Sequence, residues 1–239
     1  MNVLKSSMYL LFVGFLAVSC SSEAPATETA AEETTTEETT DAAPEAAPEE
    51  VKPAGYQVGD IAEDFNLKNV DGEMISMASM PDAKGYVVVF TCNHCPYSIA
   101  YEDRLIELDK KYKALGYPVI AINPNDPVVN PDDSPEKMVV RAEEKGFTFP
   151  YLFDDGQKVY PKYGATKTPH VYVVNKTEEG NKVAYIGAID DSEDADAVTA
   201  NYLTDALDAL VKGEEPNPNF TKAFGCSVKC QKPKEDKAI

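Results

Sequence analysis

The chain has 239 residues, of which 41 are acidic and 22 are basic, so its formal net charge at pH 7 is −19. This excess of negative charge argues against binding to nucleic acid and against electrostatic attraction to anionic lipid. The 5 cysteines are too few, and their spacings too short, for the disulfide framework of a small secreted domain.

The N-terminal residues have the pattern of an export signal. Residues 1–19 combine Lys5 with an apolar run that leads to small residues. The run is shorter than the roughly 20 apolar residues that cross a bilayer, and an N-terminal anchor left in place is the alternative interpretation. Residues 16–20 (LAVSC) resemble a bacterial lipobox, although Ala17 stands where leucine is usual. The resemblance implies cleavage before Cys20 and a lipid anchor on that cysteine, in which each buried methylene contributes about 0.8 kcal/mol.

The composition divides the rest of the chain into three parts. Residues 20–53 are almost entirely Ala, Glu, Thr, Ser and Pro, without a basic residue before Lys52. They cannot bury enough apolar surface to offset their ordering entropy, so we expect a disordered acidic tether. Residues 54–213 suffice for one compact domain, and residues 214–239 form a C-terminal tail that carries the last two cysteines.

Hydrophobic periodicity and turn residues predict the elements of the domain. In chain order we expect two short strands at 61–67 and 74–77, a strand at 87–90, a helix at about 95–115, a strand at 118–122, a helix between Ser134 and Gly146, a short helix at 154–163, a hairpin of strands at 171–174 and 183–187, and a helix at 195–211. This order of strands and helices is that of an α/β, thioredoxin-like fold, in which helices flank a central mixed sheet.

A Cys-x-x-Cys motif directly follows the apolar run at 86–90. A buried strand that ends in this motif sets two thiols at the start of the next helix, where free backbone N–H groups and the helix dipole favour a thiolate. We therefore predict that Cys92, at the helix start and more exposed than Cys95, attacks a disulfide, and that Cys95, one turn deeper, resolves the mixed disulfide. An inert disulfide or half of a zinc site is the alternative.

Four segments resemble landmarks of the redoxin branch of the thioredoxin superfamily, which includes peroxiredoxin-like proteins. They are residues 90–97 (FTCNHCPY), 121–126 (AINPND), 149–152 (FPYL) and 164–169 (GATKTP). The resemblance implies a cis peptide bond between Thr168 and Pro169, whose backbone faces the disulfide and pairs with substrate. It implies a role for His94 in stabilising the Cys92 thiolate, as in protein disulfide isomerases, and it requires neither an organic cofactor nor a metal. Thr91 could donate a hydrogen bond to a thiolate or a peroxide, but it lacks the spacing of the peroxiredoxin threonine relative to Cys92.

The tail motif at residues 225–230 (GCSVKC) resembles the Gly-Cys-x-Ile-Lys-Trp tail of this branch, with Cys230 in place of tryptophan. The substitution creates a second thiol pair, Cys226 and Cys230. This pair forms a local disulfide that pins the tail or, alternatively, exchanges electrons with the first pair.

The leading functional hypothesis is a thiol-disulfide oxidoreductase, exported and lipid-anchored to the bacterial cell envelope on its periplasmic or outer-membrane side. Its partners would be protein or small-molecule disulfides and dithiols, with an envelope electron donor. One alternative is a peroxiredoxin-like reductase of hydroperoxides. Another is a copper-binding metallochaperone that uses Cys92, Cys95 and His170, since thiolates favour Cu(I).

Overall fold

The computed structural model describes residues 55–231; the predicted signal, the lipidation site Cys20 and the tether lie outside the described residues. The strands are β1 (Leu67–Asn69), β2 (Met74–Ile75), β3 (Gly85–Phe90), β4 (Val119–Asn123), β5 (Tyr151–Phe153), β6 (Lys167–Thr168), β7 (His170–Thr177), β8 (Gly180–Gly187) and β9 (Cys226–Ser227). The helices are α1 (Pro96–Lys113), α2 (Pro135–Lys145), α3 (Tyr160–Tyr163) and α4 (Tyr202–Val211). Within this part of the chain, no helix is both long and apolar enough to span a bilayer.

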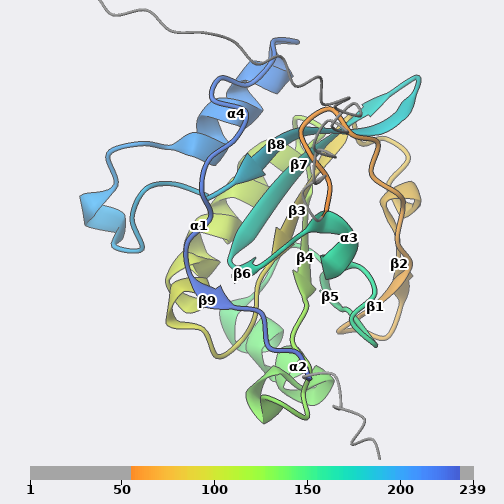
Figure 1. The fold of residues 1–239 in the computed structure, drawn as a ribbon, viewed down its shortest axis with the longest axis vertical. Helices are drawn as coiled ribbons and strands as arrows, with labels where there is room; N and C mark the ends of the chain where they lie inside the picture. The colour runs from red at the N-terminus through yellow and green to blue at the C-terminus, as the bar shows by residue number, and fades with distance from the viewer. Residues whose placement is uncertain (1–54, 232–239) are drawn as a thin grey trace, which may run out of the picture. The chain divides into compact units, whose positions relative to one another are not determined.

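A mixed sheet of 7 strands organises the domain, in the order β2-β1-β5-β4-β3-β7-β8 (Figure 1). The central strands β3, β4 and β5 run parallel, whereas β1, β7 and β8 pair antiparallel with their neighbours. All residues of β3 and β4 are buried, as expected for strands covered on both faces. The topology confirms the thioredoxin-like α/β fold.

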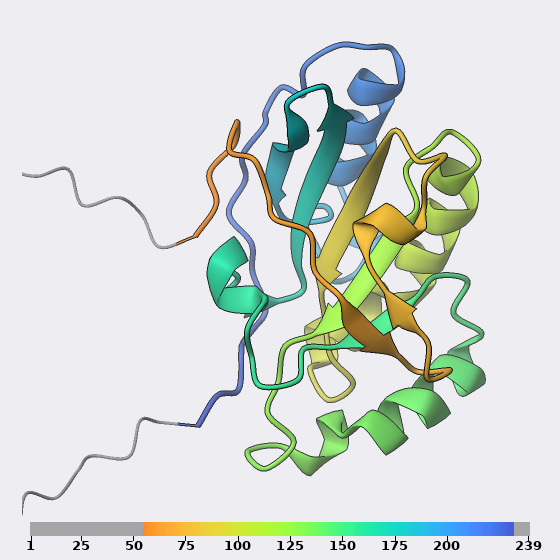
Figure 2. The ribbon, with the colours of Figure 1, turned by 90° about the vertical axis from the view of Figure 1, so that its right-hand side faces the viewer.

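Two apolar layers cover the sheet. Figure 2 shows the sheet nearly edge-on, with α1 and α4 on one side and α3 on the other. The first side packs Leu105 of α1 and Leu207 of α4 against Val87 and Val119. On the second side, Val88 and its neighbours pack against α3 and the segment that precedes β3. Burial of an aliphatic side chain of this kind contributes about 1.5–3 kcal/mol, so the sheet provides a rigid base for whatever lies at its strand ends.

Several sequence predictions hold at the level of single residues. The Ser134 side chain accepts from the Lys137 N–H and caps α2, which ends at Gly146 with φ of 64°. The predicted strand at 87–90 is β3, and the predicted hairpin is β7 and β8. Capping residues and apolar runs are local signals, which explains why they could be read without the tertiary structure.

The structure corrects other boundaries. α4 begins at Tyr202 rather than at residue 195, because the Asp191 carboxylate accepts from the Thr199 and Ala200 N–H groups and holds that segment out of a helix. The helix expected at 154–163 shortens to α3, because the Lys158 and Val159 N–H groups just before it donate to the Asp154 carboxylate. Strands β5, β6 and β9 were not predicted from the sequence, and the strand expected at 61–67 lies instead at β1, Leu67–Asn69.

Candidate active site

The two thiols lie between the end of β3 and the start of α1. Cys95 is the N-cap of α1, and Pro96 is its first residue, so Cys92 lies outside the helix. The favourable position at the helix start, expected for Cys92, therefore belongs to Cys95. Both sulfurs are buried: Cys92 is 2% exposed and Cys95 is 0% exposed. The two sulfurs are therefore less exposed to solvent than the predicted attack of Cys92 on a substrate disulfide requires.

Thr168 contacts both cysteines. The Cys92 thiol lies 3.4 Å from the Thr168 hydroxyl oxygen, and the Cys95 thiol lies 3.2 Å from the Thr168 carbonyl oxygen. The peptide bond between Thr168 and Pro169 is cis, as the resemblance implies. The structure thus brings together Cys92, Cys95, Thr168 and Pro169, which are far apart in the sequence.

The two thiols ionise as a pair. The pKa of Cys95 is lowered, chiefly by the neighbouring Cys92 thiol, although burial opposes the decrease. The pKa of Cys92 is raised by this interaction with Cys95, by burial and by the nearby Asp133 carboxylate. The Thr168 carbonyl accepts from the Cys95 thiol and so favours its protonated form. The N-terminus of α1 and the Cys92 thiol both stabilise the Cys95 thiolate, and together they outweigh this one neutral acceptor. The first proton to leave the pair is therefore that of Cys95.

A buried carboxylate lies beside the thiols. Asp133 is 0% exposed and accepts from the Asn93 N–H at 2.8 Å and from the Asn125 amide at 2.9 Å. His94 Nδ1 lies 2.5 Å from the second oxygen of Asp133. His94 thus bonds to Asp133. Any influence of the His94 ring on the Cys92 thiolate is therefore combined with that of the negative charge on the Asp133 carboxylate. Asp133 could not be recognised from the sequence as a site residue, because only the folded chain brings it to the Cys-x-x-Cys motif.

The other two predicted site residues lie differently. Thr91 is buried and its N–H donates to the Ile122 carbonyl; within the described contacts, its hydroxyl bonds to neither sulfur. His170 lies at the start of β7, where burial lowers its pKa to about 4, so the ring is neutral at pH 7. Its ring packs on Tyr172, with centroids 4.8 Å apart.

The described residues contain one group of three metal-ligand types within 4.8 Å of one another: Cys92, His94 and Asp133. His170 does not belong to it, so the set expected for a copper chaperone is not brought together. In the observed group, the His94 nitrogen and the Asp133 oxygen already bond to each other. The geometry is that of a hydrogen-bonded acid and base beside a thiol, and a metal would have to displace this bond.

The C-terminal tail crosses the site. β9 pairs antiparallel with β6, with Cys226 opposite Thr168, and Figure 1 shows the two strands side by side. The four described cysteines are free thiols. Cys226 lowers the pKa of Cys95, and Cys95 raises that of Cys226, whereas Cys230 is exposed. A disulfide between Cys226 and Cys230 stays a prediction.

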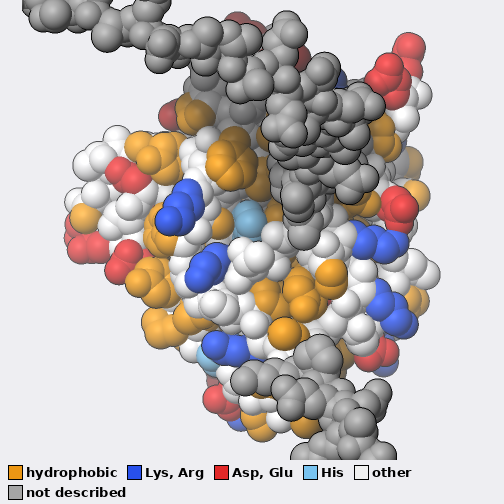
Figure 3. Space-filling view, viewed as in Figure 1, with side chains coloured by type: hydrophobic (Ala, Val, Ile, Leu, Met, Phe, Trp, Pro, Cys, Tyr) orange, Lys and Arg blue, Asp and Glu red, His pale blue; other side chains and the backbone are white. Residues whose placement is uncertain are grey.

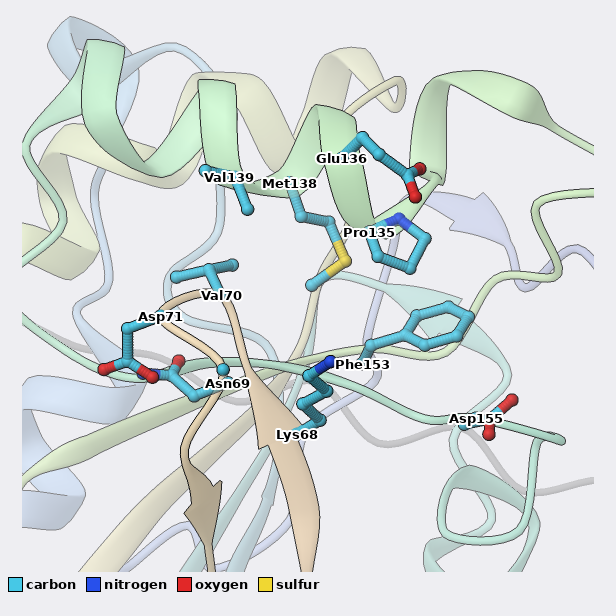
Figure 4. Close-up of a pocket in the computed structure, with 11 residues that line it drawn as sticks. Lys68, Asn69, Val70, Asp71, Pro135, Glu136, Met138, Val139, Phe153 and Asp155 are labelled. Atoms are coloured by element: carbon cyan, nitrogen blue, oxygen red, sulfur yellow. The ribbon is translucent and has the colours of Figure 1, made fainter.

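A separate groove of about 600 Å³ lies between α2 and the β1–β5 edge (Figure 4). Val70, Met138 and Phe153 form its apolar part, with Asp71 and Glu136 at its rim. No cysteine or histidine lines it, so it does not take part in the thiol chemistry.

Comparisons with known proteins agree with this site. The AhpC/TSA family matches residues 58–185. The chain is 29% identical over 128 residues to the thiol-disulfide oxidoreductase ResA of Halalkalibacterium halodurans, a match that covers 53% of this chain and 68% of that protein.

Two solved structures resemble the domain more fully. An uncharacterized conserved protein from Geobacillus kaustophilus is 36% identical, with a TM-score of 0.68 and coverage of 74% of this chain and 94% of that one. A hypothetical protein from Sinorhizobium meliloti is 29% identical, with a TM-score of 0.69 and coverage of 75% and 97%. The family match spans the strand, the Cys-x-x-Cys motif and the cis proline together, and the chain therefore belongs to the AhpC/TSA family, the redoxin branch of the thioredoxin superfamily.

Proposed function

We propose that the protein is a thiol-disulfide oxidoreductase of the cell envelope, whose redox centre is the pair Cys92 and Cys95. The observation that supports this most is the contact of one residue, Thr168 before the cis proline, with both sulfurs at the start of α1. The likeness to ResA, which is named as a thiol-disulfide oxidoreductase, points the same way.

The exchange proceeds in two steps. A thiolate of the pair attacks one sulfur of a substrate disulfide, forms a mixed disulfide and releases the other substrate sulfur as a thiolate. The second cysteine then attacks the bonded cysteine, closes the Cys92–Cys95 disulfide and releases the substrate as a dithiol. The substrate gains two electrons and the two thiol protons, and the protein loses them. Run backwards, the same steps oxidise a dithiol.

The order of attack decides which cysteine carries the mixed disulfide. The sequence predicts Cys92 as the attacker, whereas the helix N-terminus and the Asp133 charge favour a thiolate on Cys95. Serine variants separate the two orders. If Cys92 attacks, Cys95→Ser traps mixed disulfides and Cys92→Ser is inactive; the opposite pattern assigns the attack to Cys95.

The test of the function itself is the reduction of insulin disulfides by the reduced protein. We expect turnover with a dithiol donor in the wild type and at least a hundredfold loss when both cysteines are serine. Wild-type turnover no faster than that of the double variant would refute the proposal.

A second candidate, a reductase of hydroperoxides, is favoured by the family and by the lowered pKa of Cys95. In this reaction the thiolate attacks the peroxide, becomes a sulfenic acid and releases an alcohol or water, and the other cysteine then closes the disulfide and releases water. Stopped-flow oxidation by hydrogen peroxide distinguishes the two. Among the described contacts, the sulfurs meet the side chains of Ser98 and Thr168 but not the Thr91 hydroxyl that could donate to a peroxide. We therefore expect slow oxidation by peroxide and faster exchange with disulfides.

Lipid anchoring at Cys20 would hold the domain at a membrane surface, with residues 20–53 as its tether. The lipobox resemblance supports this part of the proposal. The test is metabolic labelling with a radioactive fatty acid, followed by fractionation. Label in the membrane fraction, absent from Cys20→Ala, is the expected result, and an unlabelled wild type would contradict it.

A further inference from the structure

The tail brings a third sulfur to the thiol pair. In the β6–β9 pairing, Cys226 lies opposite Thr168, and the Thr168 carbonyl oxygen is 3.2 Å from the Cys95 sulfur. This pairing places Cys226 and Cys95 at the same residue of β6, and each thiol shifts the pKa of the other. Three nucleophilic groups, those of Cys92, Cys95 and Cys226, therefore gather at one end of β6.

Contacts on both sides of Cys226 hold the tail in this position. Before it, the ring of Phe224 packs edge-on against Tyr97 of α1, with centroids 6.1 Å apart. After it, the Lys229 N–H donates to the Asn125 side-chain oxygen at 2.7 Å, and the Lys229 carbonyl accepts from the Asp126 N–H at 2.9 Å. The approach of Cys226 to Cys95 is thus built into the fold.

Gly225 permits the closest part of this approach. Its φ is +138°, and a Cβ at this position would lie 2.2 Å from the Thr168 carbonyl oxygen. Any other residue would have to push β9 away from β6. The glycine next to Cys226 is therefore required for the contact between the tail and the backbone before the cis proline.

Cys226 is also the most accessible of the three sulfurs. It is half-buried, whereas Cys92 and Cys95 are almost fully enclosed. The face that carries β6 and β9 shows basic side chains among polar and apolar ones (Figure 3). Lys167 and Lys229 favour a Cys226 thiolate, while burial and the charge of Cys95 raise its pKa to about 11. When Cys95 is bonded in a disulfide it carries no charge, so it no longer raises the pKa of Cys226 in this way.

We infer that Cys226 is a third redox thiol, which forms a disulfide with Cys95 and links the buried pair to the surface. The inference rests on the proposed function. The Cys226 thiolate attacks the Cys95 sulfur of the Cys92–Cys95 disulfide. The Cys95–Cys226 bond forms as the Cys92–Cys95 bond breaks, and Cys92 leaves as a thiolate that takes up the proton lost by Cys226. One disulfide replaces another, so no outside oxidant is consumed.

The test traps this disulfide in the full chain with Cys92→Ser. The reduced variant is treated with oxidised glutathione, free thiols are alkylated, and peptides are identified by mass spectrometry without reduction. Glutathione first bonds to one of the two cysteines and the other cysteine then displaces it, so one oxidised glutathione becomes two reduced ones. We expect the Cys95–Cys226 peptide in more than half of the molecules. Cys95 left as a glutathione adduct or as a free thiol, or Cys226 bonded to Cys230 instead, would overturn the inference.

Two further variants in the same Cys92→Ser background test the geometry. Gly225→Ala keeps every sulfur but displaces β9, so we expect at least a tenfold smaller yield of the Cys95–Cys226 peptide. Gly213→Ala is the matched control: its φ is also positive, +80°, but no atom lies within 4 Å of the added carbon. Cys230→Ser should leave the yield unchanged. Equal yields from Gly225→Ala and Gly213→Ala would contradict the role of the tail.

Failure of this inference is distinguishable from failure of the proposed function. Cys226→Ser retains Cys92 and Cys95, so their disulfide should still form in a glutathione buffer. If it forms there and in the wild type, but Cys226 never bonds to Cys95, the function stands and the third thiol is rejected. If the Cys92–Cys95 disulfide does not form in the wild type, the proposed function fails whatever Cys226 does.

Discussion

Replacement of Asp133 by asparagine should lower the pKa of Cys92. The carboxylate oxygen and the Cys92 sulfur lie within 4.8 Å of each other, and the charge of Asp133 opposes a thiolate on Cys92. At an effective dielectric constant of about 20, two unit charges at about 5 Å repel by about 3 kcal/mol, which corresponds to about 2 pKa units. The donors around Asp133 offset part of this repulsion, so we expect a decrease of about 1 unit.

The measurement isolates Cys92 by using the Cys95→Ser background. The rate at which iodoacetamide alkylates the Cys92 peptide, followed by mass spectrometry, is recorded against pH, and its midpoint gives the pKa. Asp132→Asn is the matched control, because this neighbouring carboxylate is exposed and pairs with Lys137. A midpoint that is unchanged or higher in Asp133→Asn, or equally lowered in Asp132→Asn, would refute the electrostatic argument.

Three other predictions concern stability and redox potential. Glu102→Gln should lower the free energy of unfolding, measured in urea, by about 2–3 kcal/mol, because it breaks the buried ion pair with Arg141. Glu107→Gln is the exposed control and should lower it by less than about 0.5 kcal/mol. Equal effects of the two variants would contradict the argument. The pKa of Cys95 is lower in the folded protein than in the unfolded chain, so its thiolate stabilises the reduced protein fully above the pKa of an ordinary thiol and less as pH falls. The free energy of unfolding, measured relative to that of Cys95→Ser, should therefore rise with pH towards about 9 by up to about 1.4 kcal/mol per pH unit. A difference that does not change with pH would refute this prediction. His94→Ala leaves the buried carboxylate without its ring partner, so the disulfide should become less oxidising in a glutathione titration, and an unchanged potential would remove the role of His94.

The strands β3, β4, β7 and β8 and the thiol motif could be predicted from the sequence because they depend on local patterns. A run such as that in β3, with six buried residues, has no competing helical period, and a Ser-Pro pair marks a helix start by its own chemistry. The Cys-x-x-Cys motif is likewise contiguous. The cis bond before Pro169 could be expected only through the family resemblance.

What the sequence could not show depends on long-range contacts. β9 has two residues and exists because Cys226 pairs with Thr168, a contact without a periodic signal. Asp133 reaches His94 only through the loop that precedes α2. Thr168, far from the motif in the sequence, contacts both sulfurs, and both cysteines are buried, so the greater exposure predicted for Cys92 was wrong.

The most direct test of the account is an equilibrium titration of the reduced wild-type protein in glutathione buffers, with the products identified by mass spectrometry. We predict a single two-electron transition in which Cys92 and Cys95 become joined to each other. Separate glutathione adducts on the two cysteines, with no bond between them at any ratio, would contradict the claim that they form one redox centre.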